Sequence, residues 1–133
     1  MKNLGVVDQK TNSILIVDDD LELRTLLGQL LCGQGYGVLE AGNGKEALIV
    51  LESALPSIIL LDLVMPVMDG TEFIRFLNSD PVATSKWNKI PIIIYSASVE
   101  QFSELSSYTH AQLQKPLNIS VLIETIDAIL SRS

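Results

Sequence analysis

Three short apolar runs alternate along the chain with segments that have helical periodicity. The runs lie at 13–17, 58–61 and 92–95, and they are rich in β-branched residues and free of polar alternation. Such runs are typical of strands that are buried on both faces of a parallel sheet. Residues 38–41 and 112–114 are shorter and more polar. We therefore expect them to form strands at the edges of the same sheet.

Apolar residues recur at helical spacing between these runs. They predict five helices, at 23–31, 47–51, 73–77, 99–105 and 119–130. Gly33 and Gly35 indicate the end of the first helix, and Asn118 is a candidate N-cap for the last. The order strand–helix, repeated five times, predicts an α/β fold with a parallel sheet and helices on both of its faces.

Residues 78–90 do not fit this alternation. They contain Pro81 and Trp87 and show no clear period, so we expect a long loop in which Trp87 fills the edge of the core. The polar stretch 1–12 is expected to be an N-terminal tail, and 13–133 to be one compact domain.

The composition limits the classes of protein to be considered. Of 133 residues, 47% are hydrophobic, which excludes a disordered chain, and no apolar run is long enough to span a membrane. Sixteen acidic against nine basic residues give a net charge of −7, which argues against direct binding to nucleic acid. The single cysteine, Cys32, excludes an internal disulfide and fits the reducing cytoplasm, where we expect the protein.

Acidic, hydroxyl and amine side chains follow the predicted strands. They are Asp18, Asp19, Asp20, Asp62, Ser96 and Lys115. One such residue alone is commonly a helix cap or a surface charge, and we assign Asp20 as a cap. Because parallel strands all end at the same edge of a sheet, however, we expect the set to converge on one site.

These residue types suit phosphoryl transfer. Clustered carboxylates repel one another unless a cation lies among them, and Mg²⁺ prefers carboxylate oxygens that it shares with phosphate. Lys115 and Ser96 can hold phosphate oxygens, and Asp62 is placed to attack phosphorus and form an aspartyl-phosphate.

Four motifs together resemble the receiver domain of two-component response regulators. They are the acidic strand end at 14–20, the stretch DLVMPVMDG at 62–70, Tyr95-Ser96-Ala97 and Lys115-Pro116. The resemblance covers about 13–131. It implies a flavodoxin-like, doubly wound sheet of five parallel strands in the order 2-1-3-4-5, and a cis peptide bond before Pro116.

The resemblance also implies roles for individual residues. Asp62 is the implied phosphoacceptor, and Ser96 and Lys115 are implied to contact the phosphoryl group. The implied Mg²⁺ site consists of Asp18 (through a water), Asp19, Asp62 and the backbone carbonyl of Val64. The implied phosphoryl donor is a phosphohistidine on a histidine kinase or histidine phosphotransfer protein. We expect a signalling switch rather than a turnover enzyme, acting on a downstream protein as a monomer or weak homodimer, with no membrane contact.

The chain departs from the family pattern at two places that affect switching. Gln112 stands where the family usually has Tyr or Phe, and the span from Ser96 to Lys115 is shorter by about one helical turn (~3.6 residues). We therefore expect the output to use a rearrangement other than the usual aromatic swing. Val64 and Ser98 offer little to orient an attacking water, so we also expect slow hydrolysis of the phosphorylated form.

Two other functions remain as alternatives. The first is a receiver fold that serves as an interaction module and acts independently of phosphorylation. This alternative applies whether the chain is a stand-alone receiver or part of a larger protein. A phosphatase of the haloacid-dehalogenase type needs a second acid two residues after its nucleophile. That position is Val64, which disfavours this third function.

Overall fold

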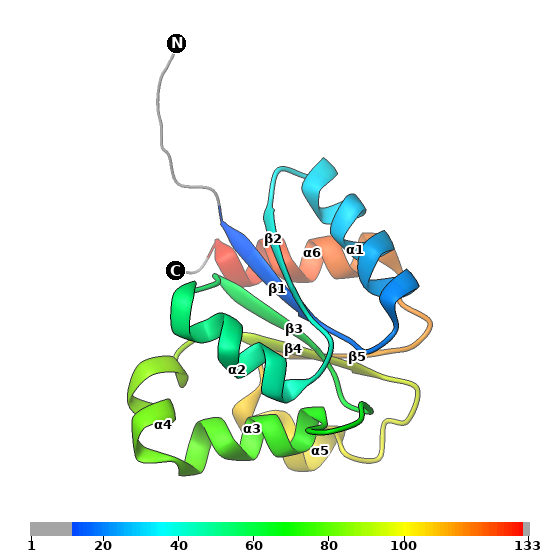
Figure 1. Cartoon of the computed structure of the whole chain (residues 1–133). Helices are drawn as coiled ribbons and strands as arrows, with labels where there is room; N and C mark the ends of the chain where they lie inside the picture. The colour runs from blue at the N-terminus through cyan, green and yellow to red at the C-terminus, as the bar shows by residue number, and fades with distance from the viewer. Residues whose placement is uncertain (1–11, 132–133) are drawn as a thin grey trace.

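Five parallel strands form one sheet in the order β2-β1-β3-β4-β5 in a computed structural model of the protein, which describes residues 12–131 (Figure 1). The strands are β1 (Ser13–Val17), β2 (Gly37–Ala41), β3 (Ile58–Asp62), β4 (Ile92–Ser96) and β5 (Ala111–Gln114). Every residue of β3 and β4 is buried, whereas the edge strands β2 and β5 are mostly half-buried. The expected strand order and the positions of the edge strands are confirmed. The expected tail at 1–12 lies outside the described residues, apart from Asn12.

Helices cover both faces of the sheet, as the sequence predicts. They are α1 (Leu21–Gly33), α2 (Gly44–Ser53), α3 (Gly70–Ser79), α4 (Pro81–Trp87), α5 (Phe102–Leu105) and α6 (Ile119–Leu130), with a 3₁₀ turn η1 (Ser106–Tyr108) after α5. Helices α1 and α6 lie on one face, and α2 to α5 lie on the other (Figure 1). Among the described residues, no helix is both long and apolar enough to cross a membrane.

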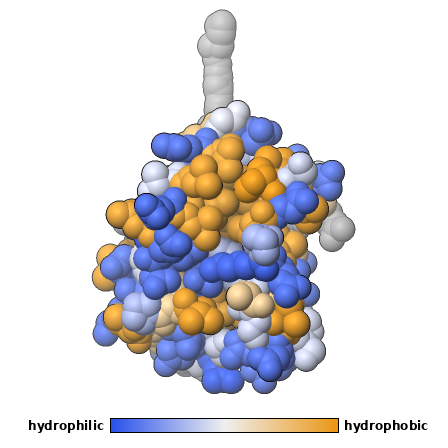
Figure 2. Space-filling view, turned by 90° about the vertical axis from the view of Figure 1, so that its right-hand side faces the viewer, coloured by the Kyte–Doolittle hydropathy of each residue, from blue (hydrophilic) through white to orange (hydrophobic). Residues whose placement is uncertain are grey.

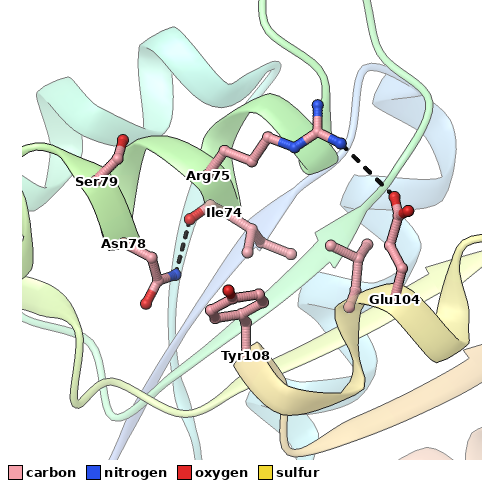
Figure 3. Close-up of a pocket in the computed structure, with 7 residues that line it drawn as sticks. Ile74, Arg75, Asn78, Ser79, Glu104 and Tyr108 are labelled. Carbon is pink, nitrogen blue, oxygen red and sulfur yellow. Dashed lines mark hydrogen bonds and ion pairs between the residues drawn. The ribbon is translucent and has the colours of Figure 1, made fainter.

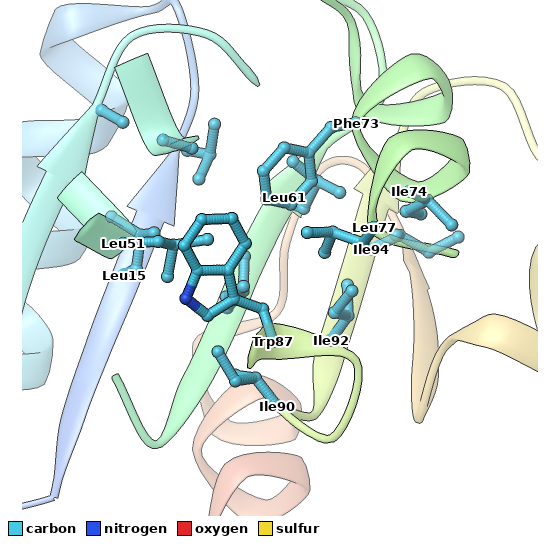
Figure 4. Packing of buried hydrophobic residues seen from close by; sticks show 14 of the residues in the cluster. Leu15, Leu51, Leu61, Phe73, Ile74, Leu77, Trp87, Ile90, Ile92 and Ile94 are labelled. Carbon is cyan, nitrogen blue, oxygen red and sulfur yellow. The ribbon is translucent and has the colours of Figure 1, made fainter. Parts of the chain in front are cut away.

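The alternation of side chains along the strands divides the core into two clusters. Ile92 and Ile94 of β4 belong to the cluster under α2 to α5, which Figure 4 shows around Trp87. Ile93 and Tyr95 belong to the cluster under α1 and α6. Successive side chains of a strand point to opposite faces, so one short strand contributes to both clusters.

The expectation of a loop over 78–90 is wrong, because α4 forms within it. Asp80 caps this helix by accepting a hydrogen bond from the Ala83 amide (3.0 Å), and Pro81 occupies the first helical position, which suits its fixed φ. An Asp-Pro pair is a helix-start signal that hydrophobic periodicity alone does not show. Trp87, only 5% exposed, fills the edge of the core as expected.

The other predicted helix boundaries agree better with the structure. Asp20 and Asn118 cap α1 and α6 by accepting hydrogen bonds from backbone amides, as expected. The helix predicted at 99–105 is shorter than expected, since α5 spans one turn and continues as η1. Gln112, at the start of β5, donates a hydrogen bond to the Thr109 hydroxyl (2.8 Å).

The loop between β3 and α3 has an unusual backbone. Val67 has a φ of 70°, in the left-handed region, and the Met68 amide donates to the Pro66 carbonyl (2.8 Å) around it. A β-branched residue rarely adopts this conformation. Gly70 follows at a close approach, where a Cβ atom would lie 2.5 Å from the Asp62 carbonyl oxygen. The loop is therefore folded tightly against the end of β3.

We predict that Val67→Asn stabilises the protein. Asn tolerates a positive φ better than Val, and Val67 is 74% exposed, so little packing is lost. The expected gain is about 1 kcal/mol in the free energy of unfolding, measured by urea denaturation. Val82→Asn, at a similarly exposed position in α4, is the control and should give no gain. Equal effects of the two substitutions would contradict strain at Val67.

Candidate functional site

Three carboxylates converge where the strands end. Asp18 and Asp19 follow β1 and Asp62 is the last residue of β3, and carboxylate oxygens from the three side chains lie within 4.8 Å of one another. Asp18 and Asp62 are buried, while Asp19 is exposed. Asp20 instead caps α1. The sequence thus predicted the cluster and correctly set Asp20 apart from it.

Lys115 reaches the cluster from the end of β5. Its amide donates to the Ser96 carbonyl (2.9 Å), which continues the pairing of β5 with β4, and its Nζ lies 3.4 Å from Oδ1 of Asp62. The peptide bond between Lys115 and Pro116 is cis. The Lys115 amine therefore lies next to the Asp62 carboxylate, as expected.

Ser96 lies at the same edge of the sheet. It is the last residue of β4, is buried, and follows Tyr95, which is paired in register with Asp62. Its Oγ accepts a hydrogen bond from the Ser98 amide (3.2 Å). The structure thus brings all the predicted side chains to one end of the sheet.

The charge balance of the site is unfavourable without a further cation. Burial and, to a smaller extent, the neighbouring Asp18 carboxylate raise the pKa of Asp62 to about 6, against the opposing effects of Lys115 and of the Val64 amide, which donates to Asp62 (3.3 Å). One lysine faces three acids. An oxygen-only set of carboxylates with excess negative charge fits a hard divalent cation such as Mg²⁺.

Tyr95 makes a polar contact with the site that the sequence did not predict. Its hydroxyl donates to Oδ2 of Asp18 at 2.5 Å, and its ring is completely buried. Burial, reinforced by the Asp18 carboxylate, raises the pKa of Tyr95 far above its usual range, so the hydroxyl stays protonated. The only sequence signal for this contact was a tyrosine near the end of a strand that otherwise begins with three isoleucines.

An apolar hollow borders the carboxylate cluster. It has a volume of about 590 Å³ and is lined mainly by apolar side chains of α1 and of the segment after β5, with Asp20 and Lys115 at its rim. Figure 2 shows an apolar area framed by polar side chains on the side of the molecule where the strands end. The apolar surface and the charged site therefore adjoin.

A second hollow, of about 560 Å³, lies between α3 and the α5–η1 segment (Figure 3). Ile74, Leu105 and Tyr108 line it, and an ion pair between Arg75 and Glu104 (3.7 Å) lies at one side. None of the site carboxylates lines this hollow, so it is separate from the cluster.

A five-stranded parallel sheet that gathers acids, a hydroxyl and a lysine at one edge defines the receiver class of signalling domains. The sequence model of the response regulator receiver domain matches residues 14–127, and the chain belongs to this family. Receiver domains of this family are parts of two-component systems.

Individual relatives agree with this assignment. The chain is 34% identical over 125 residues to the transcriptional regulatory protein CpxR of Klebsiella pneumoniae, covering 92% of this chain and 50% of CpxR. Chemotaxis protein CheY4 of Vibrio cholerae superimposes with a TM-score of 0.80 at 29% identity, covering 90% of this chain and 99% of CheY4. Response regulator TrrA of Thermotoga maritima, solved with Mg²⁺ and BeF, gives 0.76 at 29% identity over 90% of this chain and 99% of TrrA. The chain spans about half the length, or less, of the curated relatives it matches.

We predict that Asp62→Asn stabilises the metal-free protein at neutral pH. The folded state holds a proton on Asp62 up to about pH 6, whereas an unfolded Asp releases it near pH 4, so ionisation destabilises the folded state as the pH rises between these values. With EDTA present, the free energy of unfolding of the variant should exceed that of wild type by about 3 kcal/mol at pH 7 in urea denaturation, and the difference should be largely lost near pH 4.

Glu124→Gln removes an exposed carboxylate of α6 and serves as the control, for which no such pH-dependent gain is expected. A difference between Asp62→Asn and wild type that stays constant from pH 4 to pH 7 would show that Asp62 ionises without cost.

Proposed function

We propose that Asp62 accepts a phosphoryl group from a phosphohistidine on a histidine kinase or histidine phosphotransfer protein. The observation that carries this proposal is that the buried Asp62 carboxylate lies close both to Lys115 and to the Asp18–Asp19 pair. In the reaction, an Asp62 oxygen forms a bond to phosphorus while the bond from phosphorus to the imidazole nitrogen breaks, and its electron pair stays on the imidazole. The chain is then a signalling switch rather than a turnover enzyme.

Some residues at this edge of the sheet would hold Mg²⁺, and others would contact the phosphoryl group. Asp19, Asp62 and the Val64 carbonyl would hold Mg²⁺ directly, and Asp18 would hold it through a water. Bound Mg²⁺ supplies charge neutralisation for the phosphoryl oxygens. The match with TrrA, which was solved with Mg²⁺ and BeF, supports this choice of ion. Lys115 and Ser96 would hold the remaining phosphoryl oxygens, Lys115 as a cation and Ser96 through its hydroxyl.

The phosphohistidine donor is expected to cover the apolar hollow beside the site. A helix that carries the phosphohistidine has to bring the imidazole to Asp62, and the apolar surface reaches Lys115 at the rim. Leu26, 51% exposed on α1, is one of the apolar residues that such a helix would cover.

We further propose a downstream partner that is a protein, with the chain acting in the cytoplasm as a monomer or weak homodimer. CpxR is named as a transcriptional regulator, but the present chain matches only half of the length of CpxR. The net charge of −7 supports a role in which this domain itself does not contact nucleic acid. Gln112 stands where the family usually has an aromatic residue, and its side chain donates a hydrogen bond to Thr109. Signalling to the partner would therefore not depend on an aromatic ring at position 112.

The first test is the intact mass after incubation with acetyl phosphate. We expect wild type to gain one phosphoryl group only when Mg²⁺ is present, and Asp62→Asn to gain none. Glu124→Gln, the matched control, should gain the group like wild type. No gain in folded wild type, from acetyl phosphate or from a phosphohistidine donor, would favour the alternative of an interaction module that acts independently of phosphorylation.

The lifetime of the phosphorylated form tests the role of Val64. Val64 is 70% exposed and has no group that can orient an attacking water, so Val64→Asn should hydrolyse faster. We expect a factor of about ten, equivalent to roughly 1.4 kcal/mol in the activation free energy, measured by loss of mass after the donor is removed. Val82→Asn should decay like wild type. An unchanged lifetime for Val64→Asn would remove Val64 as the cause of slow hydrolysis.

A further inference from the structure

Tyr95 connects the core of the molecule to the carboxylate site. We propose that Tyr95 is a positioning residue, whose hydroxyl fixes the Asp18 carboxylate in the orientation that Mg²⁺ binding requires. This inference rests on the proposed function, which assigns Mg²⁺ to the cluster of Asp18, Asp19 and Asp62. It concerns a residue whose side chain is not itself a ligand of the ion or of the phosphoryl group.

The position of Tyr95 leaves its ring little freedom. Its backbone is paired in register with Asp62, and β3 lies between β4 and β1, so the hydroxyl reaches past β3 to contact Asp18. The ring is completely buried and belongs to the apolar cluster under α1 and α6. A closely packed ring has one available orientation, and its hydroxyl therefore has a defined place.

The Asp18 carboxylate is held at both oxygens. Oδ2 accepts from Tyr95 at 2.5 Å, a distance typical of a hydrogen bond to a charged oxygen, and Oδ1 accepts from the Asp20 amide (2.9 Å). Arg24 donates to the backbone carbonyl of Asp18 (2.6 Å) and so fixes the main chain. Because Asp18 is completely buried, an oxygen without a partner there would be costly.

A neutral donor suits this position better than a cation. Tyr95 satisfies one oxygen of Asp18 without cancelling its charge, while Lys115 makes its ion pair with Asp62. The negative charge of Asp18 therefore remains available to a divalent ion. Lys115 also lies over the Tyr95 ring, with Nζ 5.1 Å from the ring centroid. The Tyr95 side chain therefore contacts both the Asp18 carboxylate and the Lys115 amine.

Tyr95→Phe separates the effect of the hydroxyl from that of the ring. Phe keeps the packing and the contact with Lys115 but leaves Oδ2 of Asp18 without its donor. Loss of a hydrogen-bond partner of a metal-binding carboxylate typically weakens metal binding by about 10- to 100-fold. We expect the Mg²⁺ dissociation constant of the unphosphorylated protein to rise about tenfold, measured by NMR titration of backbone amide signals.

Tyr36→Phe is a matched control. The Tyr36 hydroxyl donates to Asp127 of α6, and its ring packs against the same apolar cluster, but the pair does not include the site carboxylates. This substitution should leave the Mg²⁺ dissociation constant unchanged. An unchanged constant in Tyr95→Phe, or an equal rise in both variants, would overturn the role of Tyr95.

Phosphorylation rates distinguish positioning from a loss of core packing. With acetyl phosphate as donor, Tyr95→Phe should need about tenfold more Mg²⁺ for half of its maximal rate and should reach the wild-type rate when Mg²⁺ is saturating. A lower rate that excess Mg²⁺ does not restore would overturn the inference. If wild type binds Mg²⁺ but gains no phosphoryl group, the proposed function fails, and the dissociation constants still decide the role of Tyr95.

A second measurement needs no substitution. The chain has three tyrosines, so ring-labelled tyrosine gives three NMR signals in wild type. Addition of Mg²⁺ should shift the Tyr95 signal most, with little change at Tyr36 or at Tyr108, which is remote from the cluster on the α5–η1 side. An unchanged Tyr95 signal on Mg²⁺ addition would overturn the inference even if Tyr95→Phe did not fold.

Discussion

Repulsion between buried carboxylates is the constraint on which the rest of the site depends. Asp18 follows β1, Asp62 ends the neighbouring strand β3, and both are shielded from water, so the Asp18 carboxylate raises the pKa of Asp62. Lys115 offsets part of this charge at Asp62, and Tyr95 supplies a neutral donor to Asp18. The negative charge that Lys115 does not offset favours a divalent cation at the cluster.

The two faces of the sheet have different relations to this site. The cluster under α1 and α6 contains Tyr95, whose hydroxyl contacts Asp18, so the packing on that face reaches the site directly. On the opposite face, the usual aromatic is replaced by Gln112, and α5 is reduced to a single turn. The physical connections of the site are therefore stronger toward α1 and α6, the same side on which the apolar hollow lies.

Family membership explains the overall arrangement, and individual residues explain the local details. The match over residues 14–127 accounts for the sheet order and for the convergence of acids and lysine. Particular residues account for local details. Asp80 and Pro81 start α4, and Trp87 anchors this helix in the core. Val67 adopts a left-handed backbone in the loop after Asp62.

The sequence by itself determined the strands, the two edge strands, the caps at Asp20 and Asn118, and the residues that gather at the site, because strand runs and strand-end polar residues are local signals. The sheet order followed from the resemblance to receiver domains. Tertiary structure alone decided that Tyr95 reaches Asp18, since these residues are 77 positions apart and lie on strands separated by β3. It also decided that Asp62 is buried enough for its pKa to rise. Contacts across a sheet and the loss of water depend on how the elements pack, which periodicity along the chain does not encode.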